Sequence, residues 1–369
     1  AEESLLRYLR RRLISIYPTF LFSLVAYLLQ AQQFGRISPF QWKTLAPSLL
    51  LMQSWVVVCG EQLPMENSAW SWNVPAWFLS ALVVYWVILR PLARFFKRRG
   101  LASTCLSLLA LWAFSLVPGL IERSLPEPRF ENCMLYQLQN GCLGYFHVFI
   151  AGVATARLFV LTCLKDTQTG RAPTASTESL ALAPERAPRA FRYGCCLGYL
   201  LYALYFLFVD MERMLLTFHN GGILPIMVLI ILGSALGVDP LAKYVFKTRL
   251  FKTLGQLSYA QYLMQMPLFI FFMSLFTAGG IPQPSSGARP SLPELPLVAK
   301  VLFPFALIAV GYLVQQLVQR PYTEWQQWRR EKGMEGADEK LIAWIDGTSG
   351  RCFERCRGER VRPNCEAAV

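Results

Sequence analysis

The clearest candidate for acid–base chemistry is His147, an imidazole within the apolar stretch FHVFIAGVATARLF at 146–159. Ionisable side chains are costly within the hydrocarbon of a membrane and tend to be functional there. The ordinary pKa of histidine, about 6.5, suits a general base that takes a proton from a hydroxyl at neutral pH. A histidine that only packs between helices is the alternative, and it remains open. The one other histidine, His219, is expected in a solvated turn.

Motifs for metal binding and for the commoner hydrolases are missing from the sequence. It has two histidines, no metal-ligand spacing and no Gly-x-Ser-x-Gly segment. The terminal stretch RCFERCRGERVRPNC carries three cysteines but no histidine, one ligand short of a four-ligand zinc site. We therefore expect no metal site and no permanently bound cofactor.

The stretch SWNVPAWFLS, residues 71–80, places Asn73, Trp77 and Ser80 at the start of an apolar run. Aromatic residues gather at membrane interfaces, which explains the tryptophans but not an Asn-x-Pro turn ahead of a Trp-x-x-Ser helix start. A structural explanation is a helix capped by Asn73, with Pro75 in its first turn. A functional explanation is a site for a substrate hydroxyl, and both are open.

A polar stripe interrupts the apolar segment SYAQYLMQMP. At helical spacing i, i+3, i+4 and i+7, one face carries Ser258, Gln261, Tyr262 and Gln265. Polar side chains join helices in lipid, so this face should look towards protein or a wet cavity. With the basic segment 247–252 ahead of it, the stripe fits the wall of a site for a phosphorylated donor. A hydrogen-bonded seam without a ligand is the alternative.

The elements that must position these residues are transmembrane helices. The chain is 54% hydrophobic and 16% charged, whereas soluble domains have about 25% charged residues. Its apolar runs approach the ~20 residues that span hydrocarbon. We expect an all-α, polytopic helix bundle with about eight spans, near 13–32, 75–93, 101–119, 143–164, 193–209, 221–237, 255–277 and 298–318.

Charge predicts the orientation of the bundle. If the short apolar stretch 45–58 does not span, most of the 36 lysines and arginines fall on one side. The positive-inside rule then predicts that both ends are cytoplasmic and that 45–58 is interfacial or re-entrant. We interpret the net charge of +13 as this topology signal and expect no nucleic-acid partner.

Several smaller features complete the organisation. We assign residues 1–330 to one transmembrane domain and 331–369 to a poorly ordered cytoplasmic tail, with Trp325 and Trp328 on an interfacial helix between them. The loop 165–192 is expected to be a flexible linker. Gly233 and Gly237 form a small-xxx-small pair, which is typical of close helix packing.

The non-cytoplasmic cysteines are also informative. Cys59, Cys133 and Cys142 fall on that side of the predicted topology. If the compartment is oxidising, two of them could pair, and Cys133 with Cys142 is the favoured pair because both lie in one loop.

Three stretches together resemble the acyltransferase-3 family of integral membrane acyltransferases: RYLRRRLISIYPTF, NVPAWFLSALVVYWVILRPL and LGQLSYAQYLMQMP. FHVFIAGVATARLF and LVQRPYTEW follow the same order. The resemblance implies transfer of an acyl group, often acetyl, from cytoplasmic acyl-CoA to a hydroxyl of a carbohydrate, a lipid-linked glycan or a lipid. The implied partners are membrane lipid, acyl-CoA as co-substrate and a carbohydrate or glycolipid acceptor.

The resemblance also assigns roles to residues. Donor phosphates would lie near Arg10, Arg11 and Arg12 and along the stripe of Ser258, Gln261, Tyr262 and Gln265. The acceptor hydroxyl would approach Asn73, Trp77 and Ser80 from the other face.

This sequence departs from the family pattern at several positions. We expect it to lack the family's first two spans, which carry the catalytic histidine. Ser15 stands in place of an arginine, Leu82 in place of a glutamate and Gln265 in place of a histidine. Acid–base chemistry would then depend on the family's histidine or on His147. A flippase of lipid-linked sugars and a catalytically silent relative are the alternatives.

Overall fold

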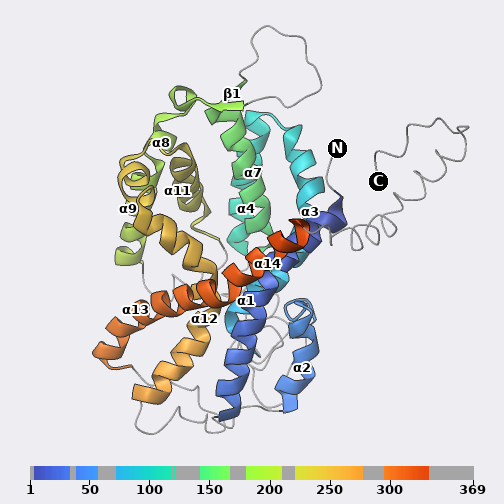
Figure 1. Cartoon of the computed structure of the whole chain (residues 1–369). Helices are drawn as coiled ribbons and strands as arrows, with labels where there is room; N and C mark the ends of the chain where they lie inside the picture. The colour runs from blue at the N-terminus through green and yellow to red at the C-terminus, as the bar shows by residue number, and fades with distance from the viewer. Residues whose placement is uncertain are drawn as a thin grey trace, which may run out of the picture.

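The computed structural model describes residues 4–33, 39–56, 72–117, 120, 142–166, 180–209, 221–276 and 295–331. His219, Cys59, Cys133 and the tail 332–369 lie outside these residues, so the predictions made for them are not addressed. In the described part the chain is mainly helical, as predicted (Figure 1).

Five helical segments are long and apolar enough to cross a membrane: Leu5–Gln30, Val74–Lys97, Cys142–Cys163, Arg249–Phe276 and Leu297–Arg329. Three shorter apolar helices are Leu101–Ser115, Gly194–Phe208 and Leu224–Leu236. Together they occupy the predicted spans and confirm an all-α membrane bundle. The shorter ones have fewer than the ~20 residues that a full crossing needs, so the predicted number of complete spans is not reproduced by length.

The helices in chain order are α1 (Leu5–Gln33), α2 (Pro39–Leu49), α3 (Trp77–Lys97), α4 (Leu101–Ser115), α7 (Phe146–Cys163), α8 (Arg189–Arg192), α9 (Gly194–Phe208), α11 (Leu224–Leu236), α12 (Arg249–Phe276), α13 (Leu297–Val314) and α14 (Arg320–Glu331). Short 3-10 turns are η1 (Val74–Ala76), η2 (Cys142–Tyr145) and η3 (Pro184–Arg186), and π-helical turns are η4 (Ala242–Phe246) and η5 (Gln315–Gln319).

Helix pairs divide the bundle into two regions. In one, α7 packs on α3 and α4, and α11 packs on α9. In the other, α12 packs on α1 and α13 and also contacts η1. Figure 1 shows α4, α7, α9 and α11 at the top, with α1 and α12 extending below them. The predicted donor and acceptor residues fall mainly on α1, η1, α3 and α12.

Glycine brings α9 and α11 into close contact. A Cβ atom on Gly233 of α11 would lie 2.3 Å from the backbone N of Cys195, and one on Gly194 would lie 2.5 Å from the carbonyl O of Leu229. The predicted packing role of Gly233 is confirmed. Gly237 was assigned the same role, but with φ +66° it ends α11 in a left-handed turn that glycine adopts without strain.

The described part of the stretch 45–58 forms no helix long enough to span a membrane. The helix α2 has 11 residues and ends at Leu49. A turn over 50–56 follows, in which Leu51 has φ 54°. Because a span needs ~20 residues, this segment is too short to cross, as predicted.

The predicted flexible linker 165–192 is wrong at both ends. Strand β1 (Leu164–Asp166) pairs antiparallel with β2 (Leu180–Leu182), and η3 and α8 follow. The hydrogen bonds between β1 and β2 pair backbone N–H and C=O groups, which the composition of the loop had suggested were hydrogen-bonded to water. The residues predicted to form an interfacial helix do form a helix, α14, where Trp325 and Trp328 are exposed and Arg320 pairs with Glu324 at 2.9 Å. Its place at the membrane interface stays a prediction.

Candidate functional site

Asn73 ties three segments together. It occupies the N-cap position of η1, yet its side chain makes no capping hydrogen bond. Its Nδ2 donates to Ser23 Oγ of α1 and to the carbonyl O of Leu263 in α12, both at 3.0 Å. The capping explanation is wrong for a physical reason: Pro75 has no N–H, and the N–H of Ala76 already bonds the backbone O of Asn73.

The polar stripe of α12 is only partly interior. The hydroxyl of Tyr262 donates to the carbonyl O of Pro75 at 2.6 Å, which joins α12 to η1. Gln261 and Gln265 are half-buried. Ser258 is exposed and donates to the carbonyl O of Gly255 in its own helix at 2.7 Å. The prediction is therefore wrong for Ser258, because a serine can satisfy its hydroxyl within its own helix.

Tyr259, which the sequence analysis missed, lies beside this stripe. Its hydroxyl donates to the carbonyl O of Ile16 in α1 at 2.8 Å. The signal was present, because Tyr259 and Tyr262 are three residues apart and so share a side of the helix. Their two hydroxyls hold α12 against two different segments.

The turn after α2 docks onto the start of α3 through polar groups. Gln53 Nε2 donates to the carbonyl O of Ala76 at 2.9 Å, and Ser54 Oγ donates to that of Trp77 at 2.9 Å. Ser80, fully buried, accepts from the backbone N–H of Ser54 at 3.1 Å through its Oγ. Sequence reasoning missed Gln53 and Ser54, although a Gln-Ser pair in the apolar run LLLMQSWVVV was a usable signal.

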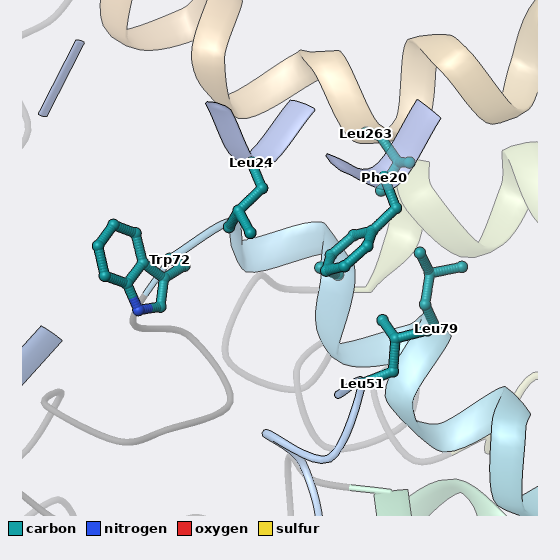
Figure 2. Close-up of a cluster of buried hydrophobic side chains, with 7 residues drawn as sticks. Phe20, Leu24, Leu51, Trp72, Leu79 and Leu263 are labelled. Atoms are coloured by element: carbon teal, nitrogen blue, oxygen red, sulfur yellow. The ribbon is translucent and has the colours of Figure 1, made fainter. Parts of the chain in front are cut away.

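An apolar shell surrounds these polar groups. Figure 2 shows its labelled members converging from α1, the turn after α2, the segment just before η1, α3 and α12: Phe20, Leu24, Leu51, Trp72, Leu79 and Leu263. All are buried. Electrostatic interactions are stronger in such a water-poor interior, and an unpaired polar atom there is costly.

Three buried oxygen atoms of this region have no hydrogen-bond partner in the part of the chain that the structure describes: Thr19 Oγ1, Gln53 Oε1 and Asn73 Oδ1. Thr19 lies one helical turn before Ser23, the partner of Asn73, and Gln53 bonds the same turn that Asn73 precedes. An unsatisfied buried group costs about 1–3 kcal/mol. Such atoms usually have a water or ligand as partner, so the cluster can accept hydrogen bonds from a bound hydroxyl.

The three predicted donor arginines lie at the N-terminal end of α1. Arg10 is half-buried, and Arg11 and Arg12 are exposed. The guanidinium groups of Arg12 and Arg90 lie 5.3 Å and 5.4 Å from the centroid of the Tyr8 ring. Cation–π contact with one ring therefore gathers positive charge from α1 and α3 at the same place.

His147 lies in the other region. It is 3% exposed on α7, with its ring 5.7 Å from that of Phe114 in α4. Its Nε2 is 3.4 Å from the position that a Cβ atom would take on Gly221. Trp77 connects the two regions, because its ring lies 5.0 Å from that of Tyr145. The structure thus brings Asn73, Ser80 and Tyr262 together around η1 and α3, whereas His147 packs against α4.

Two further sequence expectations can be placed. Leu82, which stands where the family has a glutamate, packs against two buried apolar clusters. Cys142 is a free, buried thiol that donates to the carbonyl O of Ser54 at 3.1 Å. The predicted pair with Cys133 stays a prediction, because Cys133 lies outside the described residues.

The comparisons agree with the membrane fold and with the motifs. A family model described as an acyltransferase domain matches residues 2–315. No curated protein and no solved structure matches the chain. The match covers α1 through α13, including every helix that contributes to the polar cluster. The chain is a multi-pass membrane acyltransferase that belongs to the acyltransferase-3 family.

Proposed function

We propose that this chain is an O-acyltransferase that moves an acyl group, commonly acetyl, from acyl-CoA to a hydroxyl of a carbohydrate or lipid-linked glycan. One observation carries the acceptor side of the proposal: the unpaired buried oxygens of Thr19, Gln53 and Asn73. Hydroxyl groups of a bound carbohydrate can donate hydrogen bonds to such acceptors, which would hold the acceptor molecule in the site. The family supplies the class of reaction.

The reaction joins the acceptor oxygen to the thioester carbonyl carbon, breaks the carbon–sulfur bond and releases CoA as its thiol. The hydroxyl proton passes to a base and then to the leaving sulfur. Asn73, Ser80 and Trp77 form the acceptor side. His147 packs on Phe114 and beside Gly221, whereas the unpaired oxygens lie around η1. Because His147 lies away from these oxygens, we do not assign it as the main base, and the acceptor-side hydrogen-bonding role predicted for it from the sequence stays a prediction.

The donor enters from the cytoplasm in this proposal, with its phosphates near Arg10, Arg11 and Arg12. The guanidinium groups of Arg12 and Arg90 lie over one ring, and several phosphates need several cations. Gln261 and Gln265 would line the path of the pantetheine arm.

Both chain ends and the loop 165–192 are cytoplasmic in this arrangement. Tags in the loop 165–192 and at the C-terminus should be protected from protease in sealed right-side-out vesicles, and cleavage of either tag would contradict this orientation.

Binding of CoA tests the donor site without requiring turnover. The purified chain should bind CoA, with an affinity that falls as salt rises because ions screen phosphate–arginine pairs. Replacing Arg10, Arg11 and Arg12 together by Gln should weaken binding. Arg320→Gln is the matched control, because Arg320 is exposed on α14 and pairs with Glu324. Equal CoA affinity in the triple variant and the wild type would remove the donor site from α1.

A catalytically silent relative is the second candidate, and Leu82 favours it. An apolar side chain packed in two clusters supplies no acid or base where the family has a glutamate. A silent relative would bind CoA yet leave labelled acetyl-CoA intact when offered glycolipid acceptors. Transfer of label that is lost in Asn73→Ala would establish the enzyme. Glycolipid binding without CoA binding would instead favour a flippase.

A further inference from the structure

Two adjoining hollows separate α11 from α4 and α7. The larger hollow, of about 380 Å3, lies between α4 and α11. Cys105, Leu109 and Trp112 line its α4 side. The smaller, of about 210 Å3, lies between α7 and α11. Leu224 and Val228 line both, so the hollows form one groove along α11. None of its walls belongs to the polar cluster around η1.

The two sides of α11 differ in how closely they are packed. On the side of α9 there is no free space, because a Cβ atom on Gly233 would lie 2.3 Å from the backbone N of Cys195. On the side of α4, the same helix borders an open volume. Protein interiors are close-packed and voids lose dispersion contacts. An unfilled groove of this size would therefore lower stability unless something occupies it.

A hydrogen bond fixes one end of the groove. Trp112 Nε1 of α4 donates to the carbonyl O of Gly222, just before α11, at 2.7 Å. Trp112 also lines the larger hollow. Its indole ring lies between α4 and the start of α11. The hydrogen bond therefore fixes the distance between the two helices, and the apolar side chains that line the hollow do not fill the space between them.

The chemistry of the walls selects the occupant. The larger hollow is lined by apolar residues of α4 and α11, and the smaller one adds Tyr145 and Thr155, so water would find few polar partners in the groove. The volume falls within the range of sites for small molecules, about 300–1,000 Å3. Hydrocarbon is the ligand that such walls accept and that the bilayer supplies. We propose that this groove binds a hydrocarbon chain of a bilayer phospholipid, which stays with the purified protein.

Filling the groove tests this proposal. Val228→Phe places a ring in the space shared by both hollows and should lower the phospholipid retained per protein roughly tenfold, as expected when one or two methylene contacts are lost. Val301→Phe is the matched control, because Val301 is 55% exposed on α13 and away from the groove. Native mass spectrometry of both variants in mild detergent gives the lipid content. Equal retention in Val228→Phe and wild type would overturn the proposal.

Cys105 provides a second measurement on the unaltered protein. Its thiol is exposed and lines the larger hollow. Alkylation of Cys105, followed by peptide mass spectrometry, should accelerate after delipidation and slow when dipalmitoyl phosphatidylcholine is restored. Protection by palmitoyl-CoA but not by phospholipid would make the groove a donor-chain site and overturn the proposal. Rates that delipidation leaves unchanged would also overturn it. Neither measurement depends on acyl transfer, so the proposal of a bound phospholipid can fail while the proposed function stands.

Discussion

The two regions of this bundle are joined by different means. Around η1, side chains reach across the helices: Asn73 bonds α1 and α12, and Tyr262 bonds Pro75. Between α9 and α11 the backbones themselves touch at Gly194 and Gly233. Helices in lipid gain no hydrophobic attraction for one another, so each region needs one of these devices. Side-chain bonds leave room and spare acceptors for a ligand, whereas glycine contact leaves neither.

The largest effect is expected where the backbones touch. Gly233→Val would force side-chain atoms into Gly194 and Cys195 and separate α9 from α11. Overpacking costs about 1–3 kcal/mol, and contact with rigid backbone puts this change at about 3 kcal/mol or more. Unfolding in detergent, followed by tryptophan fluorescence, measures the loss. Gly152→Ala is the control, since nothing lies within 4 Å of its new Cβ. Equal stability of the two variants would refute the close contact.

The next largest effect concerns Asn73. Asn73→Ala removes two hydrogen bonds and leaves the carbonyl O of Leu263 without this donor. The free energy of unfolding should fall by about 2 kcal/mol, because a buried group loses its partner. Ser258→Ala, which removes a hydroxyl bonded within its own helix, should change it by less than ~0.5 kcal/mol. The same unfolding assay compares them, and a loss in Ser258→Ala as large as that in Asn73→Ala would contradict the difference between them.

The sequence predicts helices better than it predicts their contacts. Runs of apolar residues reveal the spans, because such runs depend on residues near one another in the chain. The prediction that 45–58 does not cross came instead from the distribution of charge along the sequence. The role of Asn73 depends on Ser23 and Leu263, which are 50 and 190 residues away. No local pattern contains that information. The small-xxx-small spacing likewise predicted a packing role for Gly237, whereas its left-handed backbone ends α11.

The two tyrosines of α12 sharpen the comparison within the polar region. Tyr262→Phe and Tyr259→Phe each remove one hydroxyl bonded to a backbone carbonyl. Each should lower the free energy of unfolding by about 1 kcal/mol, the net value of one such bond. Only Tyr262 contacts η1, so acyl transfer should fall in Tyr262→Phe and remain near wild type in Tyr259→Phe. Equal transfer in the two variants would mean that the stripe serves packing alone.

The smallest expected effect lies at the end of α11 in the glycine-packed region, at Asp239. This buried carboxylate accepts from the thiol and the backbone N–H of Cys196 at the start of α9, and from the N–H of Leu241. A carboxylate at a helix N-terminus satisfies a backbone donor that the helix leaves unpaired. The carboxylate therefore adds a charged hydrogen-bonded link, which we call the Asp239 tie, between α9 and the segment that follows α11.

Stability should depend on pH through this tie. Burial raises the pKa of Asp239, but the hydrogen bonds from Cys196, Leu241 and Ala242 outweigh it and hold that pKa below its usual value. The folded state therefore binds fewer protons than the unfolded state near the ordinary aspartate pKa of about 3.9. The contribution of Asp239 is complete above that pH and is lost as the pH falls through the lower, folded pKa.

Asp239→Asn keeps an acceptor oxygen but does not titrate, so its melting temperature should fall less steeply than that of wild type below about pH 4. Thermal unfolding in detergent at a series of pH values measures both slopes, with Glu324→Gln on α14 as the exposed control. Because the fold has other carboxylates, only the difference between wild type and Asp239→Asn reports on this tie. Parallel curves would mean that Asp239 is hydrogen-bonded equally well when it is protonated.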